Sequence, residues 1–324
     1  MPMKRIDFIA QSTAALGSLS VSASLLKNWT PMRKQIPSIG LGLFTLPKLL
    51  EQDFTGTLSK LSKMGYQELE FFGPYSFSHQ KNKESWAQLT PMLGFKGSGL
   101  FGKELTEVQK ILKDLGLHVP AMHTDLDTLE HFMGPLSETA HALGATYVVL
   151  PSAPPETRTN LEDYKSLAER FNLIGENAKK HGISFAYHNH GYGLQKVNEI
   201  RPIDLIFEGT DPDLVYFEMD LFWTVAGRAN PQSLLEKYVG RYKMLHIKDM
   251  KSLTYFATDG GDPGEWMALF PQLTTAGAGV IDLPGILNTA LNTGVAHYFV
   301  EQDLASNPWL DLQNSYDYLK KLEF

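Results

Sequence analysis

The chain has 324 residues, with 29 Lys plus Arg against 36 Asp plus Glu, and its formal net charge is −7. This charge argues against a nucleic-acid-binding protein, because a surface that follows phosphates needs a basic excess or a dense basic cluster. Hydrophobic residues make up 43% of the chain and aromatic residues 11%, which excludes disordered, collagen-like and coiled-coil proteins. The absence of Cys excludes disulfides, thiolate metal sites and cysteine nucleophiles.

The first 26 residues differ in composition from the rest. Lys4 and Arg5 precede a charge-free run from Ile9 to Leu26 that is rich in Ala, Ser, Leu and Gly. A basic start before a short, Ser-diluted apolar stretch is typical of an export signal rather than of a spanning helix. The order Lys-Arg-x-x-Phe-Ile also resembles a twin-arginine signal with Lys in the first position. A frayed amphipathic helix is the alternative.

We therefore expect residues 1–26 to be an export signal, cleaved near Ser22 to Ser24, and residues 27–37 to be a linker. The mature protein is then expected in the periplasm, without stable membrane association.

A repeated unit occupies residues 38–324. Each joint has a helix end, a Gly that can stop the helix, and an apolar run within one to three residues; five such glycines are Gly65, Gly116, Gly144, Gly182 and Gly294. The pattern predicts eight strands, near residues 39–44, 67–72, 118–123, 147–151, 184–188, 214–220, 243–248 and 297–301. Alternating β and α elements give parallel strands with right-handed crossovers, and eight units close most simply into a single (β/α)8 barrel. A doubly wound open sheet is the alternative, but no GxGxxG turn follows the first strand.

Two predicted connections are too long to be plain loops. Residues 74–103 follow the second strand, and residues 253–280 follow the seventh. Both lie at carboxyl ends of strands, where barrel enzymes build their active sites. Their Gly-rich stretches and the tryptophans Trp86 and Trp266 suit covers over that face, although ordinary surface elaboration and packing fit the same pattern.

Polar residues gather where the last four strands end. The sequences there are YHNH at 187–190, EMD at 218–220, HIKD at 246–249 and EQD at 301–303. They place His, Asp, His and Glu on one rim, a set that suits Mn²⁺, Co²⁺, Mg²⁺ or Zn²⁺ with positions left open for substrate oxygens. The strand-five ligand is either His188 or His190. The other predicted ligands are Asp220, His246 and Glu301.

These four motifs, together with GAGVID at 277–282, resemble the sugar isomerase and epimerase superfamily with the xylose-isomerase-like barrel. The resemblance covers residues 38–319. It implies a carbohydrate substrate and a divalent ion, whose ligands match His188, Asp220, His246 and Glu301. It does not imply one reaction, because members include keto-sugar epimerases, aldose-ketose isomerases, inosose dehydratases and endonucleases of apurinic sites.

One position departs from the epimerase pattern, which has a Glu where His188 stands. The substitution removes one of the two carboxylates that exchange protons on opposite faces of a carbon. We therefore predict that Glu301 is the principal base, with His190 or His123 as the acid. The residues predicted to bind the sugar are Glu70, Asn189, Trp223, Lys248 and Asp249.

The sequence favours a metal-dependent isomerase or epimerase that abstracts a proton next to the carbonyl of a keto-sugar or oxidised sugar. The closest alternative is a lyase, dehydratase or hydratase acting on 3-oxo-glycosides or inosose-like substrates, because the same abstraction can expel a leaving group. Acidic charge and the expected export disfavour an endonuclease. A non-catalytic sugar-binding protein is a further alternative, and self-association is left open.

Overall fold

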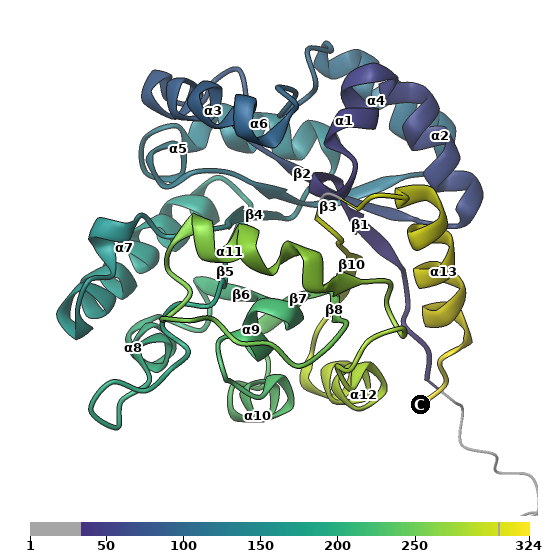
Figure 1. The fold of residues 1–324 in the computed structure, drawn as a ribbon. Helices are drawn as coiled ribbons and strands as arrows, with labels where there is room; N and C mark the ends of the chain where they lie inside the picture. Colours follow the sequence, from purple (N-terminus) through teal and green to yellow (C-terminus); the bar gives the residue numbers. More distant parts are fainter. Residues whose placement is uncertain (1–33, 304) are drawn as a thin grey trace, which may run out of the picture. The chain divides into compact units, whose positions relative to one another are not determined.

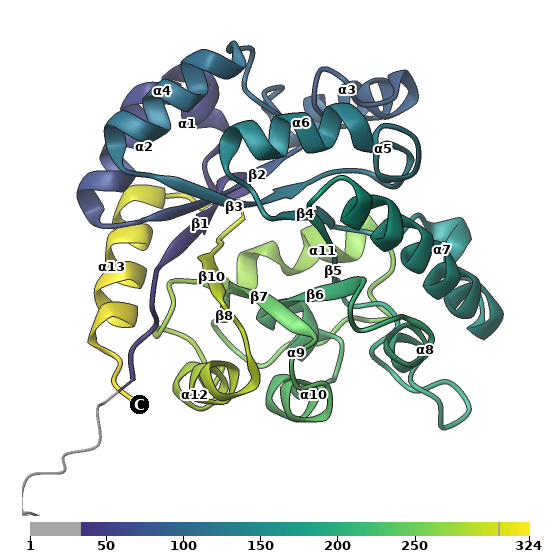
Figure 2. The ribbon, with the colours of Figure 1, turned by 180° about the vertical axis from the view of Figure 1, so that it is seen from behind.

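The computed structural model describes residues 34–303 and 305–324, so the predicted export signal and residues 27–33 of the predicted linker lie outside the described residues. Eight parallel strands form a closed barrel in the order β1-β10-β7-β6-β5-β4-β3-β2, surrounded by helices (Figures 1 and 2). The predicted (β/α)8 barrel is confirmed. Its strands are β1 (Gly40–Gly42), β2 (Glu68–Phe72), β3 (His118–His123), β4 (Tyr147–Leu150), β5 (Ser184–His188), β6 (Val215–Asp220), β7 (Tyr242–Ile247) and β10 (His297–Val300).

The helices end where the glycine pattern predicts. Gly65 and Gly144 follow α2 and α6 with φ of 106° and 81°, a left-handed conformation that costs glycine little. The helices are α1 (Pro47–Gln52), α2 (Phe54–Met64), α3 (Gln80–Leu93), α4 (Leu105–Leu115), α5 (Leu126–His131), α6 (Met133–Leu143), α7 (Leu161–Lys180), α8 (Pro202–Gly209), α9 (Leu221–Ala226), α10 (Pro231–Lys237), α11 (Pro263–Leu269), α12 (Leu283–Thr293) and α13 (Pro308–Lys321). Among the residues that the structure describes, none of these helices has the length and apolarity to cross a membrane.

The two long connections contain structure of their own. Residues 74–103 hold α3, and residues 253–280 hold α11 and a short strand β9 (Leu273–Thr274). β9 pairs in antiparallel fashion with β8 (Asp249–Met250), which follows β7 directly. Residues 253–280 therefore begin just after β8 and return to it through β9, so both ends of this connection lie next to the end of β7.

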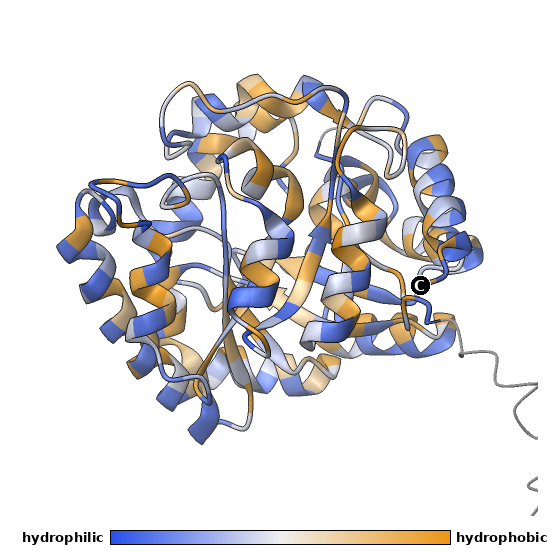
Figure 3. Cartoon of the chain, turned by 90° about the horizontal axis from the view of Figure 1, so that it is seen from below, coloured by the Kyte–Doolittle hydropathy of each residue, from blue (hydrophilic) through white to orange (hydrophobic). Residues whose placement is uncertain are grey.

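The barrel interior is layered, because side chains two residues apart on a strand point the same way. An apolar layer of Ala121, Val149, Ala186, Met244 and Phe299 fills the middle of the barrel. The outer helices bury their apolar sides and turn hydrophilic residues outward (Figure 3). Two residues beyond the apolar layer, toward the carboxyl ends of the strands, the interior becomes polar. The site described next begins there.

Candidate metal centre and active site

The polar interior consists of two tiers of side chains, and the members of one tier follow those of the other by two residues along the chain. The lower tier lies directly above the apolar layer, and the upper tier lies one step closer to the barrel mouth. The lower tier consists of Glu70, His123, His188, Glu218, His246 and Glu301, all buried. The upper tier consists of Asp220, Lys248 and Asp303, which are buried, and of His190, which is half-buried.

His246 at the end of β7 lies between two carboxylates. Its Nε2 is 2.6 Å from Glu70 Oε2, and its Nδ1 is 2.9 Å from Glu301 Oε2. Burial alone lowers the pKa of an imidazole, but the carboxylates of Glu218, Glu301 and Glu70 raise the pKa of His246 well above its usual value. Without a metal ion, this imidazole is therefore held in its charged form.

His188 at the end of β5 also has one carboxylate on each side. Its Nδ1 is 3.0 Å from Glu218 Oε2, and its Nε2 is 3.8 Å from Asp220 Oδ2. The other Asp220 oxygen, Oδ1, accepts a hydrogen bond from the backbone N–H of Trp223 and caps α9. Asp220 Oδ2 accepts no hydrogen bond among the described residues, but the Lys248 ammonium lies 3.1 Å from it. Burial lowers the pKa of His188, which favours the neutral imidazole that a metal requires.

His123 at the end of β3 completes the lower tier. Its Nε2 lies 2.7 Å from Glu218 Oε2 and 3.1 Å from Glu70 Oε2. Burial opposes the charged form, but these two carboxylates raise the pKa of His123 to about 9. Glu70, which the sequence analysis predicts to bind the sugar, contacts the imidazoles of both His123 and His246.

Three of the four predicted ligands, Asp220, His246 and Glu301, bring one side-chain nitrogen or oxygen each within 4.8 Å of one another. The fourth, His188, approaches this group through Asp220. Asp220 Oδ2 is 3.8 Å from His188 Nε2 and 3.9 Å from His246 Nδ1. Ligands around one ion at about 2.1 Å lie roughly 3–3.5 Å apart, so small side-chain shifts would close this set on an ion. The second nitrogen of each imidazole faces a carboxylate, Glu218 for His188 and Glu70 for His246, as is usual for metal-binding His.

A second group of ligand atoms overlaps with the first. His123, His188, Glu218 and His246 also bring one nitrogen or oxygen each within 4.8 Å of one another. One oxygen each of Glu70 and Glu218 is buried here without a hydrogen-bond partner among the described residues. The polar interior therefore contains a buried His and carboxylate group that fits a divalent ion.

Lys248 extends from the strand end above His246 into a cluster of carboxylates. Its Nζ is 2.7 Å from Glu301 Oε2, 2.8 Å from Asp303 Oδ2 and 3.1 Å from Asp220 Oδ2. Burial disfavours the ammonium, but Asp220, Asp303 and Glu301 raise the pKa of Lys248 well above its usual value. The carboxyl groups of Asp303 and Glu301, which both contact Lys248, differ in pKa. Burial raises the pKa of Asp303 to about 6. Lys248 and His246 outweigh the effect of burial on Glu301 and lower its pKa.

His190 faces the mouth from beyond β5. Its ring lies 4.1 Å from Trp266 of α11 and 5.9 Å from Trp223, measured between ring centroids. Burial, with the nearby His188 and Lys248, lowers the pKa of His190 well below its usual value. Its Nδ1 has no hydrogen-bond partner among the described residues. His190 is thus a neutral imidazole with a free nitrogen, which suits an acceptor better than the predicted acid.

Three other residues predicted to bind sugar shape the mouth. Asn189 is buried and donates to Thr224 Oγ1 and to the His190 carbonyl. Trp223 is 2% exposed and packs its ring against Phe256. Both carboxylate oxygens of Asp249 accept backbone N–H groups, mainly from residues 277–281. These side chains are therefore committed to neighbouring protein groups.

Glu218 and Asp303 belong to the site, although the sequence reasoning did not select them. Each is one strand step from a selected residue: Glu218 precedes Asp220 by two positions, and Asp303 follows Glu301 by two. The side-chain alternation of a strand places such pairs on the same face. Applied to every selected residue, this alternation would have found both.

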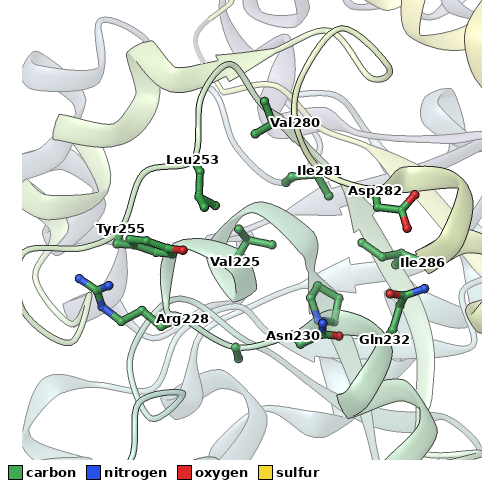
Figure 4. Close-up of a pocket in the computed structure, with 12 residues that line it drawn as sticks. Val225, Arg228, Asn230, Gln232, Leu253, Tyr255, Val280, Ile281, Asp282 and Ile286 are labelled. Atoms are coloured by element: carbon green, nitrogen blue, oxygen red, sulfur yellow. The ribbon is translucent and has the colours of Figure 1, made fainter.

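A groove on the described surface lies away from the barrel mouth. It has a volume of about 360 Å³ and lies between the segment after α9, the segment after β8 and the start of α12 (Figure 4). Its walls are mostly apolar, and Arg228 stacks its guanidinium on Tyr255 while Asp282 caps α12. Convergent titratable groups, which mark catalytic sites, are found in the barrel mouth rather than in this groove.

Comparison with known proteins places the chain in a family. Residues 58–322 match the family described as Xylose isomerase-like TIM barrel. The chain belongs to this family. A solved structure described as a sugar phosphate isomerase/epimerase from Parabacteroides distasonis is 26% identical, with a TM-score of 0.67 over 87% of this chain and 93% of that one. The IolI protein with a bound zinc atom has a TM-score of 0.62 over 88% of this chain and 95% of that one, and its 18% identity shows the fold alone.

Curated relatives by sequence include inosose dehydratases. The protein of that name from Bacillus licheniformis is 31% identical over 147 residues, which are 44% of this chain and 48% of its own length. The inosose dehydratase from Clostridium beijerinckii is 27% identical over 190 residues, which are 50% of this chain and 61% of its own. The matches thus span about half to three fifths of these relatives.

Proposed function

We propose that the protein is a divalent-metal-dependent lyase that removes water from an oxidised cyclic polyol or keto-sugar. The inosose dehydratases among its relatives support this choice of reaction over the predicted isomerisation or epimerisation. The observation that carries the proposal is the pair formed by Glu301 and Lys248, whose Oε2 and Nζ atoms lie 2.7 Å apart. A base and a proton donor stand side by side at one mouth.

The proposed elimination uses these two groups in turn. Glu301 accepts the proton from the carbon next to the substrate carbonyl, and the electrons of that C–H bond form a carbon–carbon double bond. The C–O bond of the neighbouring hydroxyl breaks with its electron pair, and the departing oxygen takes a proton from Lys248 and leaves as water. A bound divalent ion supplies polarisation of the substrate carbonyl, which makes the adjacent C–H more acidic.

Two features of the mouth favour elimination over epimerisation. Adjacent groups of opposite charge suit removal of a proton and a hydroxyl from one face of the substrate, whereas epimerisation exchanges protons on two faces. The strand-five position, where a second carboxylate would act, carries His188, whose Nδ1 is engaged with Glu218. His190 Nδ1 has no hydrogen-bond partner among the described residues and can accept a hydrogen bond from a substrate hydroxyl. Trp266 of α11 packs against the His190 ring.

Product analysis tests the reaction class. The metal-loaded protein is incubated separately with an inosose, a 3-oxo-glucoside and a free ketose, and the products are followed by mass spectrometry and near-ultraviolet absorbance. Dehydration is expected to give a product lighter by one water, with the new absorbance of a conjugated ketone. A product of unchanged mass from any of these substrates, with no lighter species, would overturn the lyase assignment.

An isomerase or epimerase is the second candidate. The Parabacteroides distasonis structure supports it, because that protein is described as a sugar phosphate isomerase/epimerase and matches over nearly its whole length. Both reactions begin with proton abstraction next to a carbonyl, so they share Glu301 as the base. Only the fate of the neighbouring C–O bond separates them, and the mass of the product reports it directly.

We propose further that the protein acts after export. The basis is the sequence around Lys4 and Arg5, ahead of the charge-free run to Leu26. The substrate would then be met outside the cytoplasm.

A further inference from the structure

Lys248 holds the oxygens that the proposed metal needs. Its Nζ contacts Glu301 Oε2 at 2.7 Å and Asp220 Oδ2 at 3.1 Å. The same two oxygens face the ligand nitrogens: Glu301 Oε2 is 2.9 Å from His246 Nδ1, and Asp220 Oδ2 is 3.8 Å from His188 Nε2. An ammonium and a divalent ion beside the same two oxygens repel each other, and burial makes that repulsion strong.

Asp303 provides an alternative ion-pair partner for the Lys248 ammonium. Its Oδ2 is 2.8 Å from Lys248 Nζ, and it is buried in the upper tier without any contact to the imidazoles of the lower tier among the described residues. The Lys248 side chain, 3% exposed, also passes the ring of Trp223, whose centroid is 5.3 Å from Nζ. A small rotation toward Asp303 would release Asp220 Oδ2 and Glu301 Oε2 without exposing the charge. Lys248 would stay in the same mouth as Glu301, where the proposed function uses the two as proton donor and base.

We propose that Lys248 and the divalent ion compete for Asp220 Oδ2 and Glu301 Oε2, and that Asp303 holds the Lys248 ammonium in the mouth once the ion has taken these oxygens. The inference rests on the metal ion of the proposed function, but it concerns ion binding alone. Lys248 thereby weakens ion binding, and in exchange the mouth keeps a proton donor beside the substrate. Asp303 acts through Lys248 and is a positioning residue.

The test is the affinity for Zn²⁺ and Mn²⁺ of the full mature chain, stripped of metal and measured by competition with a chromophoric chelator at one fixed pH. Lys248→Met keeps a long, unbranched side chain and removes its charge, so it is expected to bind both ions about tenfold tighter or more. The matched control is Lys251→Met, three residues further on, where the exposed Nζ donates a hydrogen bond to the Pro271 carbonyl. The control should change the affinity by less than about twofold.

The role of Asp303 is tested in both backgrounds. Asp303→Asn is expected to weaken ion binding in the wild-type chain, because the displaced ammonium then has no charged partner. In the Lys248→Met background the same substitution should have little effect. An equal loss in both backgrounds would show that Asp303 binds the ion itself and would overturn its positioning role.

Lys248→Met leaves three buried carboxylates without their ammonium and could fail to fold. The charge-balanced double variant K248M/D303N avoids this, and it is expected to bind ions tighter than Asp303→Asn alone. If removal of Lys248 does not tighten binding in either comparison, the competition is excluded. If the wild-type chain binds neither ion, the proposed function fails together with this inference, whereas an untightened but metal-binding variant overturns the inference alone.

Discussion

Glu70 and His246 meet at the floor of the barrel mouth, where Glu70 Oε2 lies 2.6 Å from His246 Nε2 although 176 residues separate them in the chain. The contact fixes the ring so that Nδ1 faces Asp220 and Glu301. A carboxylate in this place orients the imidazole and raises its basicity toward a metal. Glu70 therefore positions His246, a proposed metal ligand, and is not itself one of the proposed ligands.

We predict that Glu70→Gln weakens metal binding by about tenfold to a hundredfold, the usual effect of removing such a carboxylate. Binding is measured by chelator competition on the metal-stripped protein. The matched control is Glu68→Gln, two residues before Glu70 on the same face of β2, where Glu68 contacts His297 at 3.0 Å instead. Equal affinities for the two variants would contradict the role assigned to Glu70.

Asp249 is predicted to matter for stability rather than for substrate binding. Its carboxylate accepts hydrogen bonds from the N–H groups of Met250, Gly277, Gly279 and Ile281, so it ties β8 to the segment before α12. Asp249→Ala should lower the free energy of unfolding by about 3 kcal/mol or more, because four backbone N–H donors, two of them in the buried residues Met250 and Ile281, lose their acceptor. Urea titration measures the loss.

Asp282→Ala is the comparison for this loss. Asp282 is exposed and accepts one N–H at the start of α12, from Gly285, so its loss should cost about 1 kcal/mol. If Asp249→Ala lowers the free energy of unfolding by no more than Asp282→Ala does, the hydrogen bonds of Asp249 do not have the stabilising role assigned to them.

The contrast between Asp249 and Glu218 explains what the sequence could predict. Strand alternation and glycine stops predict the barrel, and the strand ends identify His188, Asp220, His246 and Glu301 as neighbours. Glu218 follows from the same alternation. Three of the four partners of Asp249 do not, because they are backbone groups 28 to 32 residues away in a loop whose conformation has no periodic pattern. The placement of Lys248 among three carboxylates likewise depends on side-chain rotation above the strands.

The metal-free protein should lose stability as the pH rises from about 6.5 to 9. The carboxylates of Glu70 and Glu218 raise the pKa of His123 to about 9, above its unfolded value near 6.5. A raised pKa contributes stability that is complete below the unfolded pKa and disappears as the pH passes the folded pKa. The raised pKa of His246 acts with the same sign, whereas the lowered pKa values of His188 and His190 remove stability only below this window.

Urea titrations of the metal-free protein across this pH range measure the effect. The contribution of His123 amounts to at most about 3 kcal/mol between the two ends of the range. His123→Gln should flatten the profile. A wild-type profile that is level or rises with pH would show that the buried imidazole is not held in its charged form.

Export predicts a specific mature N-terminus. Protein isolated from its native host should begin near Leu25, because the charge-free run after Lys4 and Arg5 ends at Leu26. Mass spectrometry of the intact protein and of its N-terminal peptide gives the answer. Replacing Lys4 and Arg5 by Gln should leave the precursor uncut, and a wild-type chain found in the cytosol with its original N-terminus would disprove the prediction.

Glu301 provides the sharpest prediction about chemistry. Lys248 and His246 lower its pKa against the effect of burial, so the carboxylate stays ionised at neutral pH and is ready to accept a proton. Glu301→Gln keeps the shape and one coordinating oxygen but removes the base, so turnover should fall by about two to four orders of magnitude while most of the metal is retained. Gln302→Ala is the neighbouring control, because the Gln302 side chain contacts Asp311 rather than the mouth, and its turnover should stay near that of the wild type.

During turnover in D₂O, the wild-type enzyme should also place deuterium on the carbon next to the carbonyl when abstraction is reversible. If Glu301→Gln retains full activity and no deuterium enters the substrate or the product, Glu301 is not the base, and metal-assisted hydrolysis or simple sugar binding accounts better for the site.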